Sequence, residues 1–141
     1  MNSSAARLRD DALEIWHAGV AAVDSQQLVR EVVHVDREKN NLQGDRLWLE
    51  ISGTPVPFAP GSRLVVVGAG KAGAGMAAGL EEALGGSVIE QLDLDGWVNM
   101  PADCVRQLKR IHLHGARPAG INEPSEEGVV GSGRILEMVG A

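Results

Sequence analysis

The sequence predicts an α/β fold: a Rossmann-like, mostly parallel sheet with flanking helices and an antiparallel edge hairpin. Leu64 to Val67 is apolar on both faces, which is typical of a strand buried in the middle of a parallel sheet. This run leads directly into the glycine-rich turn Gly68 to Gly73 and then into a helical pattern. The chain has 18 glycines but only three tryptophans, one phenylalanine and no tyrosine, so its core must be packed from aliphatic residues. That composition favours an α/β layer fold over an all-β sandwich.

Length and charge exclude several classes of protein. The 141 residues suffice for one domain, and 44% of them are hydrophobic, as in soluble globular proteins. A net charge of −6 leaves no basic field for nucleic acid, which we therefore exclude as a partner. The apolar runs are shorter than the roughly 20 residues of a membrane span, and the N-terminus is too polar for a secretory signal. We expect a cytoplasmic protein without membrane contact, in which the single cysteine, Cys104, is a buried or half-buried thiol.

The first half of the chain shows helical and then alternating periodicity. Ala5 to Val23 is predicted to be an amphipathic helix, because its apolar residues recur at helical spacing. A second, shorter helix follows, capped by Asp24 or Ser25. Alternation over Val33 to Asp36 and over Leu47 to Ile51 predicts an antiparallel hairpin with one wet face. Four residues are then expected to break the chain before the next element: Pro55, Pro57, Pro60 and Gly61.

The helix predicted from about Lys71 to Leu84 is unusually rich in glycine. Gly73, Gly75 and Gly79 each cost it roughly 1 kcal/mol relative to alanine. We expect this cost to be offset by close contact with the sheet beneath and with a ligand or neighbouring domain above. The pair Gly85-Gly86 is the natural stop of the helix.

Four further elements follow. Gly96 to Met100 is predicted to be a strand, Ala102 to Leu108 a short helix, and Arg110 to His114 another strand. Gly115 to Pro124 is too rich in glycine and proline to be regular. A last helix begins near Pro124, with four candidates for its buried side: Val129, Ile135, Leu136 and Val139.

The glycine turn is the strongest candidate for a binding site. A turn between a buried strand and a helix presents free backbone N–H groups at the positive end of the helix dipole, which favours anions. Gly68, Ala69 and Gly70 form this turn, and Lys71 adds a full positive charge. Gly68, Gly70 and Gly73 also satisfy G-x-G-x-x-G, which leaves a dinucleotide-binding fold open, with Glu90 or Asp93 as the ribose acid. A Walker phosphate loop is excluded, because Val65 and Ala72 stand where glycine and Ser or Thr are required.

Two later segments carry further candidate residues. Arg117, Asn122 and Glu123 lie in one loop and could reach the mouth of a cleft at the carboxyl ends of the strands, although Asn122 could instead cap a helix. His112 and His114 share one face of a strand, but the sequence shows no third ligand nearby, so we assign no metal site. Glu126 and Glu127 are expected to supply first-turn charge to the last helix.

The string Val65 to Ala72, with Gly-Ala-Gly-Lys-Ala at its end, resembles the glycerate 2-kinases, a family with an N-terminal Rossmann-like domain and a C-terminal domain named after a Met-Phe-Arg-Leu motif. The resemblance extends over nearly the whole chain, through four more segments: Ala12 to Asp24, Gly96 to Asn99, Ala116 to Pro124 and Arg134 to Glu137. It implies that residues 1–141 are the N-terminal segment of the Rossmann-like domain, with the C-terminal remainder absent. The family's Ser-Gly-Gly-Gly-Ser motif is not found, so we expect the isolated chain to be inactive.

The resemblance also implies a reaction: phosphorylation of D-glycerate to 2-phosphoglycerate by ATP with magnesium. The family's catalytic lysine falls on Lys71, and the turn and the later loop would bind substrate or phosphate. Many members have a His-Pro pair where this chain has Arg117-Pro118, and a guanidinium can clamp an anion but cannot act as a base. Two alternative functions stay open: an NAD(P)-dependent hydroxypyruvate reductase, and a non-catalytic fragment that binds a ligand or pairs with another chain. Assembly as a homo-oligomer also stays open.

Overall fold

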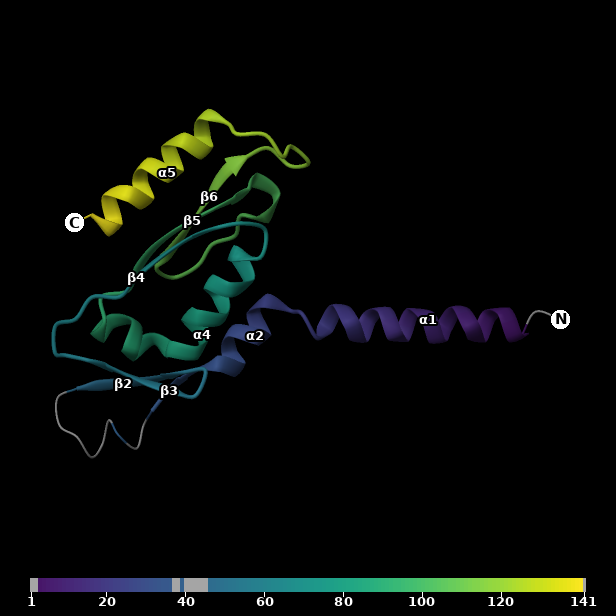
Figure 1. Cartoon of the computed structure of the whole chain (residues 1–141), viewed down its shortest axis with the longest axis horizontal. Helices are drawn as coiled ribbons and strands as arrows, with labels where there is room; N and C mark the ends of the chain where they lie inside the picture. The colour runs from purple at the N-terminus through teal and green to yellow at the C-terminus, as the bar shows by residue number, and fades with distance from the viewer. Residues whose placement is uncertain (1–2, 37–38, 40–45, 141) are drawn as a thin grey trace.

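The computed structural model describes residues 3–36, 39 and 46–140, and stacks them in layers (Figure 1). Helix α5 covers one face of a parallel sheet, α4 covers the opposite face, and an antiparallel sheet packs on the far side of α4. The predicted α/β class with a parallel sheet and flanking helices is confirmed. No helix in the described part of the chain has both the length and the apolar character needed to cross a bilayer.

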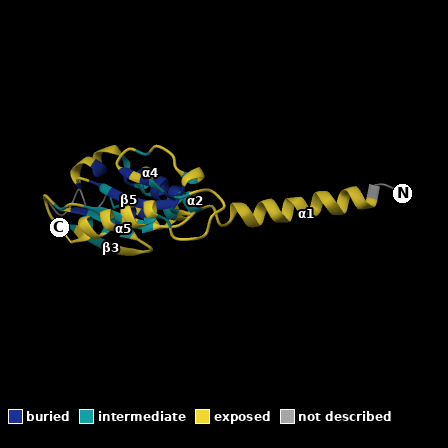
Figure 2. Cartoon of the chain, turned by 90° about the horizontal axis from the view of Figure 1, so that it is seen from above, coloured by how far each residue is buried: buried dark blue, intermediate teal, exposed yellow. Residues whose placement is uncertain are grey.

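The two N-terminal helices form where the sequence predicts them. Helix α1, Ser3–Ala21, projects away from the layers, and its side chains are exposed from Ser4 onward (Figure 2). Helix α2, Ser25–Val32, begins at the N-cap Asp24, whose carboxylate accepts a hydrogen bond of 2.8 Å from the backbone N–H of Gln27. Of the two capping residues that the sequence offers, Asp24 is therefore the one used.

The antiparallel sheet contains strands β1 (Val33–Val35), β2 (Leu47–Ile51) and β3 (Thr54–Phe58), in that order. The predicted hairpin is confirmed by the pairing of His34 with Glu50, and it belongs to a sheet of its own. The expectation that Pro55 and Pro57 break the chain is wrong, because both lie within β3. Strand β3 is an edge strand, where a missing backbone N–H can face away from the ladder.

The parallel sheet contains β4 (Val65–Ala69), β5 (Asp95–Pro101) and β6 (Ile111–Arg117), in the order β4-β5-β6. Strand β4 is therefore at an edge of the described sheet, and its predicted central position is wrong. Coverage of both sheet faces produces the same apolar run in an edge strand as in a central one, so the pattern does not report the number of neighbouring strands. Strand β6 also extends to Arg117, into the segment predicted to be irregular.

Helix α4, Gly73–Gln91, breaks at the predicted stop, where Gly85 has φ 72° and ψ 164°, and then resumes. Its glycines allow close packing on two sides. A Cβ at Gly73 would lie 2.6 Å from Val98 of the sheet, and one at Gly79 would lie 3.1 Å from the carbonyl carbon of Gln26 in α2. The expected contact with the sheet is confirmed, but the upper neighbour is α2 of the same chain, where we expected a ligand or another domain.

The C-terminal part departs from the prediction in two respects. The helix expected over Ala102 to Leu108 is reduced to the 3₁₀ turn η1, Ala102–Cys104, and the Cys104 thiol is half-buried as expected. Helix α5, Glu126–Val139, turns Gly131 toward the sheet. Ile135 is partly buried, but the other three residues predicted on the buried side are exposed: Val129, Leu136 and Val139. Because Gly131 has no side chain, the side of α5 that carries it can approach the sheet most closely.

Candidate functional site

A pocket of about 550 Å³ opens where the three parallel strands end and α5 begins. Strand ends and the first turns of a helix line it: Ala69, Gly70, Asn99, Met100, Pro101, Ala116, Arg117, Glu123, Pro124, Ser125, Gly128, Val129 and Ser132. The carboxyl ends of parallel strands are where ligands bind in open α/β sheets. The volume is within the range of small-molecule sites.

The glycine turn forms one wall of the pocket. Gly70 has φ 131°, a conformation that favours glycine, and its N–H donates a 2.9 Å hydrogen bond to the backbone oxygen of Asn99. The N–H of Gly73 donates to the oxygen of Gly70 at 3.1 Å. Ala72 is the N-cap of α4, and no side chain caps this end of the helix. The N–H groups of Gly70 and Gly73 are therefore used within the fold. The donors left for an anion in this turn are the N–H groups of Lys71 and Ala72, to which the described residues supply no acceptor.

The opposite wall is the N-terminus of α5. The hydroxyl of Ser125, the N-cap, donates to the oxygen of Ala116 at 2.6 Å and accepts from the N–H of Gly128 at 3.2 Å. Glu127 stands in the first turn, as predicted, and a hydrogen bond from its own backbone N–H lowers the pKa of its carboxyl. The Nε2 atom of His114 lies 2.9 Å from the backbone oxygen of Glu127. These contacts attach the start of α5 to the end of β6.

The loop after β6 closes on itself through Arg117. One guanidinium nitrogen, Nη1, donates to the backbone oxygen of Ile121 and to the side-chain oxygen of Asn122. Asn122 is thus held by Arg117, and the alternative that it caps the last helix is wrong, because Ser125 does so. No described residue accepts a hydrogen bond from Nε or Nη2 of Arg117. Those two nitrogens are a pair that can bind a carboxylate or phosphate through two parallel hydrogen bonds.

The structure brings together four of the seven residues that the sequence singles out. Ala69, Gly70, Arg117 and Glu123 line the pocket. The other three lie next to lining residues: Gly68 precedes Ala69 in β4, Lys71 follows Gly70 and is exposed, and Asn122 precedes Glu123.

Sequence reasoning missed Asn99 and Ser125. Asn99 is only 7% exposed and lies near the end of β5. A polar residue at the carboxyl end of a predicted parallel strand is the signal that could have found it.

The acid required by the dinucleotide alternative is at the wrong end of the sheet. Asp93 lies just before the amino end of β5, 3.7 Å from Arg63, and Arg63 also forms a 2.8 Å ion pair with Asp95. Glu90 lies near the C-terminal end of α4, at the same end of the sheet as Asp93. A ribose-binding acid belongs at the carboxyl end of a strand, beside the glycine turn.

The two histidines pack against a tryptophan on the neighbouring strand. The rings of His112 and His114 lie 4.2 Å and 5.1 Å from that of Trp97, between ring centroids. No group of three His, Cys, Asp or Glu side chains suited to a metal ion occurs among the described residues.

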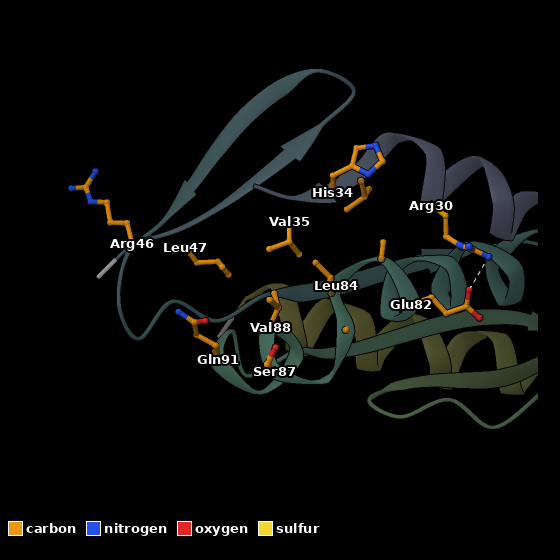
Figure 3. A pocket seen from close by; sticks show the side chains of 13 residues that line it. Arg30, His34, Val35, Arg46, Leu47, Glu82, Leu84, Ser87, Val88 and Gln91 are labelled. Carbon is orange, nitrogen blue, oxygen red and sulfur yellow. Dashed lines mark ion pairs between the residues drawn. The ribbon is translucent and has the colours of Figure 1, made fainter. Parts of the chain in front are cut away.

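A second pocket, of about 880 Å³, lies between the antiparallel sheet and α4 (Figure 3). Val35 and Leu47 approach Leu84 and Val88 across it, and the exposed ion pair between Arg30 and Glu82 spans 3.4 Å at one end. This pocket contains neither the glycine turn nor a strand's carboxyl end from the parallel sheet. The smaller pocket is therefore the better candidate for the functional site.

Comparison with known proteins identifies the family of this chain. The model of a domain of unknown function, DUF4147, matches residues 11–141. The chain belongs to the DUF4147 family. This is the N-terminal domain found in glycerate kinase-like proteins. The match of the DUF4147 domain includes both walls of the candidate site.

One solved structure shares the fold of this DUF4147 chain. It is the PH0495 protein from Pyrococcus horikoshii OT3, with a TM-score of 0.63 and 23% sequence identity over 94% of this chain. The chain spans 26% of the length of that protein. No curated protein matches the sequence.

Proposed function

We propose that this DUF4147 domain is the N-terminal part of an ATP-dependent glycerate 2-kinase, which phosphorylates D-glycerate to 2-phosphoglycerate. The observation that carries the proposal is the glycine turn. It leads into a helix N-terminus without a side-chain cap, has Lys71 exposed beside it, and borders a pocket at the carboxyl ends of the parallel strands. Family membership supports the same class of reaction.

The chemistry of phosphoryl transfer suits these groups. Transfer of a phosphoryl group requires positioning and fixed positive charge more than covalent chemistry. In our proposal the backbone N–H groups of the turn and the Lys71 ammonium hold an anion, either the carboxylate of glycerate or a phosphate of ATP. The unused nitrogens of Arg117 hold a second anionic group across the pocket.

The residues present are compatible with a magnesium ion that enters with the nucleotide. Mg²⁺ is usually held by one or two carboxylates together with substrate phosphates and water. Glu123 is the carboxylate that lines the pocket and would supply such a ligand. When bound, the ion would neutralise charge on the transferred phosphate.

The test is an ADP-release assay with D-glycerate on the full-length protein that carries this chain. Lys71→Ala is expected to lower kcat/KM by about 100-fold or more, because one fixed charge at the reacting centre is lost. Lys71→Arg should retain part of the activity. Lys109→Ala is the matched control, because Lys109 is exposed and precedes the amino end of β6. Full activity in Lys71→Ala would overturn the assigned role.

Binding experiments separate this proposal from its alternatives. Calorimetric titration with ATP and Mg²⁺ and with D-glycerate is expected to show binding, and titration with NADH none. Binding of NADH in place of ATP would favour the reductase. Turnover of glycerate by the 141-residue chain alone would show that it is a catalyst by itself, against our proposal that it needs the rest of the protein.

A further inference from the structure

Asn99 is a buried polar residue that has no role in the reaction proposed above. It lines the candidate pocket from β5 and is 93% buried, the complement of its 7% exposure. Its backbone oxygen accepts the N–H of Gly70, so the same residue also holds the glycine turn in place. Asn99 therefore contacts the turn through its backbone and borders the pocket as well.

The orientation of the Asn99 amide is determined by a neighbour on the same strand. Trp97 lies two residues earlier, on the same face of β5, and its indole N–H donates a 3.0 Å hydrogen bond to Oδ1 of Asn99. An indole nitrogen can only donate, so the atom it contacts must be the amide oxygen. The amide nitrogen Nδ2 is then left over, and it forms no hydrogen bond to any residue that the structure describes.

The Asn99 side chain is otherwise buried, but Nδ2 is not completely enclosed, so this donor is left open to an acceptor from outside the protein, either water or an oxygen of a ligand. Helix α5 restricts the room for any other arrangement. A Cβ on Gly131 would lie 2.6 Å from His114 and closer still to Asn99, so the amide is packed tightly on the helix side. Asn99 also lines the pocket, so an acceptor that enters the pocket can approach the amide from the side away from α5.

We propose that Asn99 is a ligand-binding residue that donates a hydrogen bond from Nδ2 to an oxygen of an anionic ligand, and that Trp97 is the positioning residue that keeps the amide in this orientation. The ligand oxygen belongs to a carboxylate or a phosphate. This inference rests on the proposed function in so far as both place an oxyanion at the glycine turn, and it adds a selective element. A site with a buried donor discriminates against ligands that cannot accept its hydrogen bond.

The decisive variant is Asn99→Asp. Asp keeps the oxygen that accepts from Trp97 but replaces the donor with a second, negatively charged oxygen that repels an anion. Affinity for inorganic phosphate, D-glycerate or ATP with Mg²⁺ is expected to fall by about 10- to 100-fold in calorimetric titration. Gln107→Glu is the control for charge, because it adds the same unit charge on an exposed residue outside the pocket.

A second measurement does not depend on any variant keeping its fold. In ¹H–¹⁵N spectra of the unsubstituted protein the two side-chain amide signals of Asn99, assigned through their bonds to the Asn99 backbone, should shift when the binding anion is added. Trp97→Phe removes the indole donor and should weaken binding by less than Asn99→Asp does, since the amide can then rotate but still donate.

The outcomes separate the two proposals. Weaker binding in Asn99→Asp together with shifted Asn99 signals supports the inference, even if the full-length protein fails to phosphorylate glycerate, which would overturn only the proposed function. Unchanged affinity in Asn99→Asp and unshifted signals would overturn the role of Asn99 and leave the kinase proposal intact. If none of the three anions binds, both proposals are wrong.

Discussion

Replacement of Gly79 by alanine tests why α4 contains so many glycines. In an exposed helix this change should stabilise the protein by up to about 1 kcal/mol, because glycine is a poor helix former. Here the added methyl group would lie 3.1 Å from the carbonyl carbon and Cα of Gln26, and closer still to its oxygen. These are backbone atoms, so a rotamer change cannot relieve the clash, and α2 must move by about 1 Å to restore ordinary contacts. Overpacking of this kind costs about 1–3 kcal/mol.

Gly133→Ala is the matched control. Gly133 lies within α5, and a Cβ there would meet no atom within 4 Å. The helix-propensity gain applies to both variants, so the difference in their unfolding free energies measures the clash with α2. In urea denaturation followed by tryptophan fluorescence, we expect Gly79→Ala to be less stable than Gly133→Ala by about 1–3 kcal/mol. If the two variants are equally stabilised, α2 does not pack against this face of α4, and the explanation for the glycines is wrong.

Three further predictions concern one contact at the amino end of β6 and two at the start and middle of α5. Glu81→Gln should lower the free energy of unfolding by about 1–3 kcal/mol, because the buried carboxylate accepts hydrogen bonds from three backbone N–H groups of residues 109–111. Glu82→Gln, at an exposed ion pair, is the control and should cost less than about 1 kcal/mol; urea denaturation compares the two variants. The lowered pKa of Glu127 means that its ionised carboxylate stabilises the fold above the ordinary pKa of 4.5, and that this stabilisation is lost as the pH falls through the pKa in the folded state. Thermal unfolding at a series of pH values should therefore show a smaller loss of stability on acidification for Glu127→Gln than for the unsubstituted protein. Gly131→Ala should weaken anion binding, measured by calorimetry, because the new methyl group displaces the Asn99 amide.

The sequence predicts most elements correctly because their signals are local. The cap at Asp24, the alternation in β1 and β2, and the break at Gly85 each depend on a few neighbouring residues, and each is confirmed. The strand β3 was missed because its prolines look like breakers unless the strand is known to be at an edge, which is a property of the whole sheet.

The buried side of α5 could not be read from hydrophobicity. A periodic pattern assigns Val129 and Leu136 to the core, but both are exposed, at 70% and 69%, while Gly131 faces the sheet. The choice is decided by what stands opposite the helix. Asn99 and His114 occupy the space that larger side chains on α5 would need, and neither their position nor their contact with α5 is visible in the local sequence.

The same close approach explains why the candidate site combines residues that the sequence shows with residues that it hides. The glycine turn is visible because its residues are contiguous and its physical role depends on the backbone alone. The donor on Asn99 emerges only when three separate conditions hold: β5 lies beside β4, Trp97 orients the amide, and the glycine face of α5 closes the far side. Glycine therefore has two roles in this chain. At the turn it leaves backbone donors accessible to a ligand, and in α5 it allows the helix to pack closely against the buried Asn99 amide beside the pocket. A substitution that fills either kind of space should affect the site, the first by direct obstruction and the second by moving the amide.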